Sequence, residues 1–258
     1  MARPRPRSRR LLRPGLTVTG WPPPSLDLPP RTRSALAVYA HPDDPEVSCG
    51  GTLARWAAAG SEVHLLLATL GEKGSSEPDT DPAVLARVRA DEVAAAAEAL
   101  GVAGVEQLGH PDGELDRVPQ LRGEVVAAVR RVRPDVVVCP DPTAVFFGDG
   151  YVSHVDHRVI GWACLDAVAP ASSLPHYFPE AGPAHAVATV LLSGTLEPDV
   201  WVDVEDALDA KAAAMRCHRT QLGGVGAELD DLVRARAADE GRRGGLGAAE
   251  AFRRLRLR

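Results

Sequence analysis

The amino-acid sequence predicts an α/β fold with a mostly parallel sheet, and three features of the pattern support this. From residue 34 onward, apolar runs of strand length alternate with segments of helical length. The first two runs, residues 36–40 and 61–69, enclose one helical segment, which is typical of a βαβ unit with parallel strands. Polar loops follow the strands, where open α/β sheets bind their ligands. We therefore expect a single Rossmann-like domain whose sheet is flanked by helices.

Glycine and proline set the limits of the expected elements. Gly60 and Gly101 close two helices, since glycine readily adopts the left-handed conformation that follows a helix end. Pro82 stands at a helix start, and Pro134 and Pro140 bound a buried strand. The expected strands are residues 36–40, 61–69, 105–108, 135–140, 186–192 and 200–204. The expected helices are residues 50–59, 83–100, 117–132, 155–168 and 205–219.

Composition divides the chain into three parts. Residues 1–33 are rich in arginine and proline, which build neither a helix nor a central strand and bury little apolar surface, so we expect a disordered basic arm. Residues 34–222 carry the alternating pattern and form the expected domain. Residues 223–258 are rich in alanine, arginine and glycine, and we expect a helical extension or tail there.

Charge and cysteine content exclude several classes of protein. The formal net charge of −6 argues against a nucleic-acid binder. No apolar segment of the sequence approaches the length of a membrane-spanning helix, and Arg9 and Arg10 are followed by Arg13 and Pro14 instead of the apolar stretch of an export signal. The four cysteines are scattered without a CxxC pair, as reduced core thiols are. We expect a cytoplasmic protein that binds neither nucleic acid nor a membrane.

The most informative stretch is the loop that follows the first expected strand. It reads His41, Pro42, Asp43 and Asp44, and the proline ends the strand. A histidine and an aspartate three residues apart on one turn can bind the same metal ion, with Asp43 beside it. A catalytic zinc site takes three protein ligands and keeps one position open, so a further histidine is expected from elsewhere. The alternative is a loop of acidic residues with a solvated or capping histidine.

A second histidine cluster offers the third ligand. His154 and His157 stand three positions apart at the start of an expected helix, so their side chains are neighbours on one face. One of them can reach the metal while the other points into the adjoining cavity. Asp156 between them can accept a ring N–H, which fixes a histidine tautomer. The alternative is a helix N-terminus with polar caps.

Together these motifs resemble those of the LmbE-like (PIG-L type) family of zinc-dependent N-deacetylases. That family includes N-acetylglucosaminyl-phosphatidylinositol deacetylases and the deacetylases and amidases of mycothiol and bacillithiol metabolism. The resemblance covers roughly residues 34–222 and departs from the family at Pro45, usually acidic, and Val155, usually proline. Its motifs are AHPDD at 40–44, CGGT at 49–52, GEKG at 71–74, LGHPDG at 108–113, VCPD at 138–141, YVSHVDH at 151–157 and RCHRTQ at 216–221.

The resemblance implies a role for each residue of the two clusters. By position it implies His41, Asp44 and His157 as ligands of Zn²⁺, with Fe²⁺ as the alternative metal. It implies Asp43 as the general base that accepts a proton from water. It implies His154 as the group that polarises or protonates the scissile amide.

Asp156 is expected to support catalysis through its neighbour His154. Its carboxylate would raise the pKa of His154 by attraction and by accepting a ring N–H. The imidazolium would then persist near neutral pH and face the oxyanion.

Arg89, Asp112 and Tyr151 are expected to bind the substrate. Arg89 and Glu92 match an R-x-x-E pattern that faces the sugar in the family, although ion pairing along a helix explains the pattern equally well. Asp112 stands on a rim loop where it would hydrogen-bond sugar hydroxyls, its alternative being an ordinary turn aspartate. Tyr151 would line the entrance, and His218 is expected to be a satisfied core histidine.

The predicted function is therefore removal of an N-acyl group, N-acetyl in the first place, from a small amino sugar or glycoconjugate. One alternative is an amidase that acts on a thiol conjugate of the mycothiol type. Another is a non-catalytic Rossmann-type binding protein, which should have lost one of the ligands or the base, and none is lost. The oligomeric state is left open, and a homo-oligomer is one option.

Overall fold

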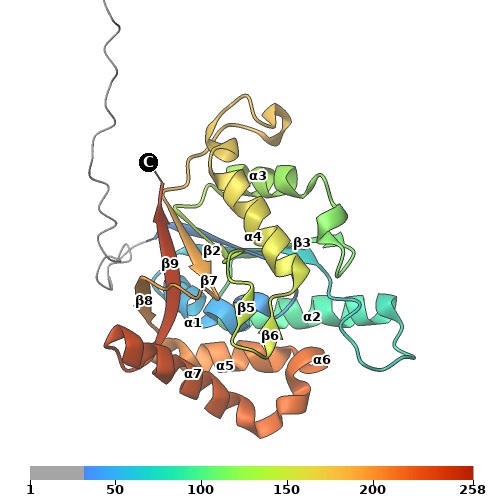
Figure 1. Ribbon diagram of the computed structural model, residues 1–258, viewed down its shortest axis with the longest axis vertical. Helices are drawn as coiled ribbons and strands as arrows, with labels where there is room; N and C mark the ends of the chain where they lie inside the picture. Colours follow the sequence, from blue (N-terminus) through green and yellow to red (C-terminus); the bar gives the residue numbers. More distant parts are fainter. Residues whose placement is uncertain (1–31, 258) are drawn as a thin grey trace, which may run out of the picture.

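The computed structural model describes residues 32–257. Among these residues, seven strands form one sheet in the order β3-β2-β1-β4-β7-β9-β8, and β5 pairs with β6 in a separate hairpin (Figure 1). The strands are β1 (Ser34–Tyr39), β2 (Glu62–Thr69), β3 (Gly104–His110), β4 (Val136–Pro140), β5 (Phe146–Phe147), β6 (Tyr151–Val152), β7 (Thr189–Ser193), β8 (Val200–Asp203) and β9 (Ala249–Arg256). The α-helices are α1 (Asp44–Ala58), α2 (Pro82–Leu100), α3 (Leu121–Val132), α4 (Val155–Val168), α5 (Leu208–Cys217), α6 (Arg219–Leu222) and α7 (Leu229–Gly244).

The sheet is mostly parallel, as predicted. Neighbouring strands from β3 to β7 pair in parallel, whereas β9 is antiparallel to both β7 and β8. Because side chains alternate across a strand, β1 buries Ala35, Ala37 and Tyr39 on one face and Leu36 and Val38 on the other. A strand that is apolar on both faces is the mark of a parallel sheet covered on both sides.

Helices cover both faces of the sheet. Helices α1, α2, α5 and α7 pack on one face, and α3 and α4 pack on the other (Figure 1). Cys49, Leu53 and Trp56 anchor α1 in the first layer, and Ile160 and Cys164 anchor α4 in the second. The chain thus forms the predicted single α/β domain with a helical layer on each side.

Most expected elements are present, with shifts of a few residues at their ends. The largest shift is at α1, which begins at Asp44 and not near residue 50. Cys49 interrupts this helix with φ −147°, so a second helical stretch starts close to the expected position. The expected strand at 186–192 is shorter, at Thr189–Ser193, and the expected helix at 205–219 covers only Leu208–Cys217.

The interruption at Cys49 is stabilised by a buried carboxylate from the far end of the chain. Glu250 on β9 accepts hydrogen bonds from the backbone N–H groups of Gly51 (2.9 Å) and Thr52 (2.8 Å). It also accepts the Thr52 hydroxyl (2.6 Å) and pairs with the Lys211 ammonium at 2.6 Å. A carboxylate at the start of a helical stretch satisfies N–H groups that have no partner within the helix.

The C-terminal part differs from the expected helical extension or tail. It supplies helix α7 and then β9, which inserts into the sheet between β7 and β8. Phe252 of β9 is completely buried in the core. The strand was hidden in the sequence because its residues include Glu250, Arg253 and Arg254, whose charges mask the period-two pattern.

The expectation of a disordered arm at residues 1–33 falls almost wholly outside the described residues, which begin at Thr32. Within residues 32–257, every helix is too short or too polar to cross a lipid bilayer.

A buried arginine organises the long connection between α4 and β7. Arg130 of α3 is only 3% exposed and donates hydrogen bonds to six backbone carbonyl oxygens of this connection. The acceptors are the carbonyl groups of Ala171, Ser172, Leu174, Tyr177, Phe178 and Gly182. A guanidinium has five N–H donors in a rigid plane, which suits it to holding several carbonyls of an irregular segment at once.

The topology brings the polar loops to one edge of the sheet. The loops after β1, β2, β3 and β4 all leave the carboxyl ends of parallel strands, so they meet on the same side. The loop after β4 carries the β5–β6 hairpin and leads directly into α4. Both histidine clusters found in the sequence therefore lie at this edge.

Candidate active site

The turn between β1 and α1 places three polar side chains at the sheet edge. The Asp44 carboxylate accepts the backbone N–H of His41 at 2.8 Å, which closes the turn locally. Asp43 adopts φ 77°, a left-handed conformation that is unfavourable for a non-glycine residue. Its carboxylate does not cap α1, although it occupies the position where aspartate usually does so. The strained backbone thus directs the Asp43 side chain into the cavity.

Three ligand atoms from the two clusters converge to form a metal-binding arrangement. His41 Nδ1 lies 3.1 Å from His157 Nε2 and 3.4 Å from Asp44 Oδ2, and His157 Nε2 lies 3.1 Å from Asp44 Oδ1. Zinc bonds of about 2.0–2.2 Å in tetrahedral geometry separate neighbouring ligand atoms by about 3.3–3.6 Å. The spacing and the chemistry of the donor set therefore both fit such an ion. His41, His154 and Asp156 form a second, overlapping group of potential ligands.

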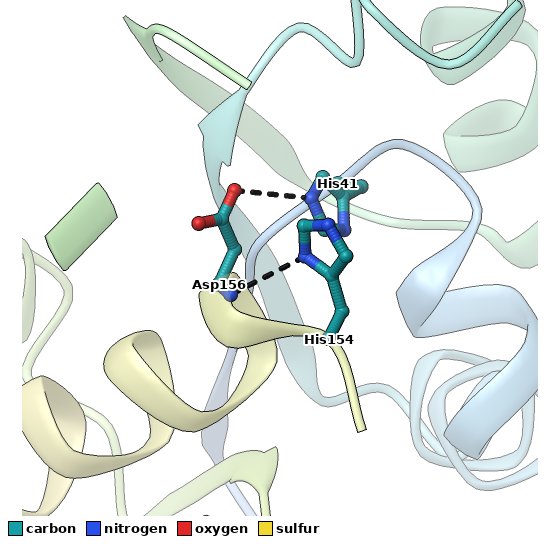
Figure 2. Close-up of side chains that lie close together, drawn as sticks. All are labelled: His41, His154 and Asp156. Carbon is teal, nitrogen blue, oxygen red and sulfur yellow. Dashed lines mark hydrogen bonds and ion pairs between the residues drawn. The ribbon is translucent and has the colours of Figure 1, made fainter. Parts of the chain in front are cut away.

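The opposite side of the His41 ring faces two further carboxylates. His41 Nε2 lies 3.1 Å from Asp112 Oδ1. It also lies 3.3 Å from Asp156 Oδ2, a contact that Figure 2 shows. Burial of the ring opposes its protonation, but hydrogen bonds to Asp112, Asp156 and Asp44 outweigh burial and raise the pKa of His41 to about 12. Conversely, these contacts with His41 lower the pKa of Asp112 and Asp156 against the effect of their own burial. With Nε2 held as a donor, His41 presents Nδ1 to the metal position.

Asp156 contacts a different histidine from the one expected. Its carboxylate accepts the N–H groups of Gly113 (2.7 Å) and Leu115 (3.1 Å) in addition to approaching His41. The ring of His154 is met instead by the backbone N–H of Asp156, which donates to Nδ1 at 3.3 Å (Figure 2). The reason is the helix start, where His154 is the cap residue and its ring accepts a free N–H.

This hydrogen bond also fixes the protonation of His154. Since Nδ1 is an acceptor, the neutral ring carries its proton on Nε2. Burial, followed by the charge of His41, lowers the pKa of His154, although Asp156 acts in the opposite direction. The expected imidazolium near neutral pH is therefore not supported, and a neutral Nε2–H donor takes its place.

Asp43 is the buried acid beside the three ligands. Burial, followed by the negative charge of Asp44, raises the pKa of Asp43 to about 7. The pKa of Asp44 moves the other way, because hydrogen bonds from His157 and His41 overcome its burial and lower it. Adjacent carboxylates with pKa values pulled apart are typical of acid–base sites.

A buried histidine beside the turn pairs with a carboxylate that the sequence analysis did not single out. His218 is completely buried, and its Nε2 lies 3.2 Å from Glu46 Oε2. Burial opposes protonation, yet contact with Glu46 raises the pKa of His218, whose charge in turn lowers that of Asp43. His218 is a core histidine as expected, but neither of its ring nitrogens makes a hydrogen bond of good geometry within residues 32–257, and its polar contact is the ion pair with Glu46. The sequence did not indicate Glu46 as its partner.

The site opens into a polar cavity of about 830 Å³. Tyr151 and Arg89 line it, and Asp112 lines it next to His41. The expectation that these three residues bind the substrate stays a prediction. The lining further includes Lys73, Gly74, Ser75, Ser76, Glu77, Thr220 and Gln221. Lys73, Thr220 and Gln221 are residues that the sequence analysis did not single out.

Arg89 and Glu92 bond different partners, so the expected alternative of a mutual ion pair does not describe their contacts. Arg89 donates to the carbonyl groups of Gly71 and Gly74, at 2.8 Å in the latter case, and thereby shapes the loop after β2. Glu92 accepts the hydroxyl of Thr220 at 2.6 Å and its N–H at 3.0 Å. Gly71 has φ 66°, and a Cβ there would collide with the Arg89 guanidinium.

Comparison with known proteins gives concordant matches. The profile of the family described as PIG-L, GlcNAc-PI de-N-acetylase, matches residues 36–168, which include both histidine clusters. The diacetylchitobiose deacetylase of Thermococcus kodakarensis is 32% identical over 194 residues, covering 74% of this chain and 70% of that protein. The 1D-myo-inositol 2-acetamido-2-deoxy-alpha-D-glucopyranoside deacetylase of Streptomyces avermitilis is 37% identical over 259 residues, covering 76% and 84%.

A solved structure extends the similarity to the fold. The N,N'-diacetylchitobiose deacetylase of Pyrococcus horikoshii, determined with an inhibitor, superposes with a TM-score of 0.79 at 28% sequence identity. The similarity covers 87% of this chain and 84% of that one, so it reaches well beyond the residues that the family profile matches.

Proposed function

Because the chain belongs to the PIG-L family of GlcNAc-PI de-N-acetylases, we propose that it removes the N-acetyl group from a small amino sugar or glycoconjugate. The observation that carries this proposal is the juxtaposition of three metal-ligand atoms with Asp43 at the floor of an open polar cavity. A cavity of this size accommodates a sugar with its substituents.

A divalent metal ion fits the three ligand atoms of His41, Asp44 and His157, with Zn²⁺ as the first choice and Fe²⁺ as the alternative. When bound, such an ion supplies Lewis acidity toward a carbonyl oxygen and makes water more acidic. Asp112 and Asp156 hold the far nitrogen of His41 and so orient its ring. This role explains why Asp112 is buried against His41 rather than projecting from the rim.

The chain's own residues provide the proton transfers. Asp43, with its pKa raised to about 7, is poised to accept a proton from the attacking water. His154 donates its Nε2–H to the carbonyl oxygen of the scissile amide and stabilises the negative charge that develops there. Asp43 then returns its proton to the leaving amine, since the single N–H of His154 is engaged with the oxygen.

The test is release of acetate from N-acetylglucosaminides by the metal-loaded protein. We expect one acetate and one free amine per turnover, and almost none with Asp43→Asn. Amine release from mycothiol-type thiol conjugates without activity on simple N-acetyl sugars would instead favour the amidase alternative. No turnover on either class, with full metal occupancy, would contradict the proposal.

A further inference from the structure

A second cavity of about 450 Å³ lies on the other side of the β5–β6 hairpin. It is bounded by α5, the segment from residue 222 through α7, the start of β9 and the loop after β7. Figure 1 shows the hairpin in front of the sheet, between α4 and the α5–α7 layer. The apolar residues of its wall include Met215, Val225, Leu229, Leu232, Val233 and Ala237.

The two cavities are direct neighbours along three segments of the chain. In the hairpin, Tyr151 lines the first cavity and Phe147 the second, and their ring centroids are 5.7 Å apart. In α6, Gln221 lines the first cavity and Leu222 lines the second. In α1, Asp44 faces the first and Val47 the second. A substrate seated at the metal ligands would therefore reach the second cavity by passing the Phe147–Tyr151 pair.

Both carboxylates in the second cavity are paired with cations of the same cavity. Lys211 is paired with Glu250 at 2.6 Å, and Arg243 with Glu240 at 2.7 Å. Arg236 stands on the exposed side of α7. The buried pair, Lys211–Glu250, is already matched, and Arg236 and Arg243 are exposed to solvent. An ionic ligand therefore gains little inside the cavity, and the apolar wall favours an uncharged hydrocarbon or aromatic group.

Exposed apolar side chains gather at the same place. Leu232, at 55% exposure, and Leu196 border the second cavity. The hairpin, whose Phe147 lines this cavity, also exposes Phe146, Tyr151 and Val152. Isolated exposed apolar residues are common, but a cluster at the mouth of a cavity marks a binding surface.

We propose that the second cavity binds an apolar aglycone, so that the substrate is an amino sugar with a hydrocarbon or aromatic substituent. This inference rests on the proposed deacetylase function and specifies its substrate class. The sugar occupies the polar cavity with its acetamide at the metal ligands. The substituent passes the hairpin and packs against α5 and α7.

The test compares methyl and hexyl glycosides of N-acetylglucosamine as substrates of the metal-loaded, full-length protein. We expect kcat/KM to be at least about tenfold higher for the hexyl glycoside, because several methylene groups leave water. Leu232→Asp should reduce that ratio to about threefold or less while leaving the methyl glycoside rate within about twofold. The matched control is Leu174→Asp, a change at a 45% exposed leucine that lines neither cavity, which should keep the full ratio.

A binding measurement separates this inference from the proposed function. Calorimetry with hexyl glucoside, which has no acetamide to cleave, should show binding to the unchanged protein and to Leu174→Asp, and much weaker binding to Leu232→Asp. If this pattern appears but neither glycoside is deacetylated, the cavity assignment holds and the deacetylase proposal falls. Equal kcat/KM for both glycosides, or a preference that survives Leu232→Asp, would overturn the cavity assignment.

Discussion

Two clusters of buried charged groups flank helix α1, and they are built in opposite ways. In the Lys211–Glu250 cluster, one carboxylate accepts four hydrogen bonds, from Lys211, Gly51 and both donors of Thr52. In the cluster around His41, three carboxylates converge on a single imidazole, and His157 shares one of them. The first cluster balances one carboxylate with one ammonium group, whereas the second holds three carboxylates around an imidazole that can carry only one positive charge.

The contrast separates a structural ion pair from a functional site. A closed pair with matched partners holds elements together, and its net benefit to stability comes mainly from not leaving either charge unpaired. An excess of carboxylates in a cavity is stabilised only by a proton or a cation from outside. Backbone strain also marks the cluster around His41 as the functional one. The neighbouring Asp43 keeps a left-handed conformation that costs on the order of 1–3 kcal/mol.

The largest effect is expected from removing two ligands of the open cluster. The double variant His41→Ala, His157→Ala should bind no metal tightly, and elemental analysis should find less than about a tenth of an ion per chain. In the unchanged protein, metal uptake should release a proton, because His41 has a pKa of about 12 without metal and must free Nδ1. Calorimetry in buffers of different ionisation enthalpy measures that proton. Full occupancy in the double variant would place the metal elsewhere.

Breaking the Lys211–Glu250 cluster should lower the stability of the fold and leave the catalytic rate unchanged. Lys211→Met leaves Glu250 buried without its cation, so we expect the free energy of unfolding to fall by about 3–5 kcal/mol in urea titrations. Metal content and kcat of the remaining folded protein should be unchanged. Arg234→Met is the control, because it removes an exposed pair with Asp209 and should barely alter stability. Loss of kcat in folded Lys211→Met would show that the two clusters are coupled.

Within the open cluster, Asp43→Asn should keep the metal and lower kcat at least about a hundredfold, the scale of a lost general base. The pH dependence has a defined sign. The folded-state pKa of Asp43 is raised to about 7, so metal-free protein should lose stability as pH rises from about 4 to 7, and the Asn variant should lack that slope. Thermal unfolding of both proteins across this range provides the measurement.

The smallest of these effects concerns His154. His154→Ala should lower kcat/KM by about a hundredfold, as for the loss of one hydrogen-bond donor to an oxyanion. Because its neutral ring loses no proton between pH 7 and 9, the shape of the alkaline pH profile should remain the same in this variant. An alkaline limb that disappears with His154 would restore the imidazolium interpretation.

Sequence predicted the parts of the molecule that depend on near neighbours in the chain. The apolar run of β1 and the polar turn after it are adjacent in sequence, so the local pattern was enough to predict that this loop carries the site. The contact of Asp156 with His41 and that of Glu250 with Gly51 span 115 and 199 residues. Spacing along the chain does not specify which of several acidic residues meets a given partner.

The fold also gives some residues partners that residue type had not suggested. Asp112 is expected on a rim loop beside the sugar and does line the cavity, but its contact with His41 was not foreseen. Glu250 and Lys211 belong to residue types that are rarely buried, yet they meet in the core. In each case the partner, which only the fold supplies, decides the role.

The six hydrogen bonds from Arg130 to backbone carbonyl groups should make the connection between α4 and β7 harder to unfold locally. Residues 171–182 lack long helices or strands, and such a connection would ordinarily open by itself and exchange its amide hydrogens quickly. Here, opening would strip a buried guanidinium of its acceptors, so the segment should open only together with α3. Amide hydrogens in the connection and in α3 should then exchange as one cooperative unit, and Arg130→Lys should split that unit in two.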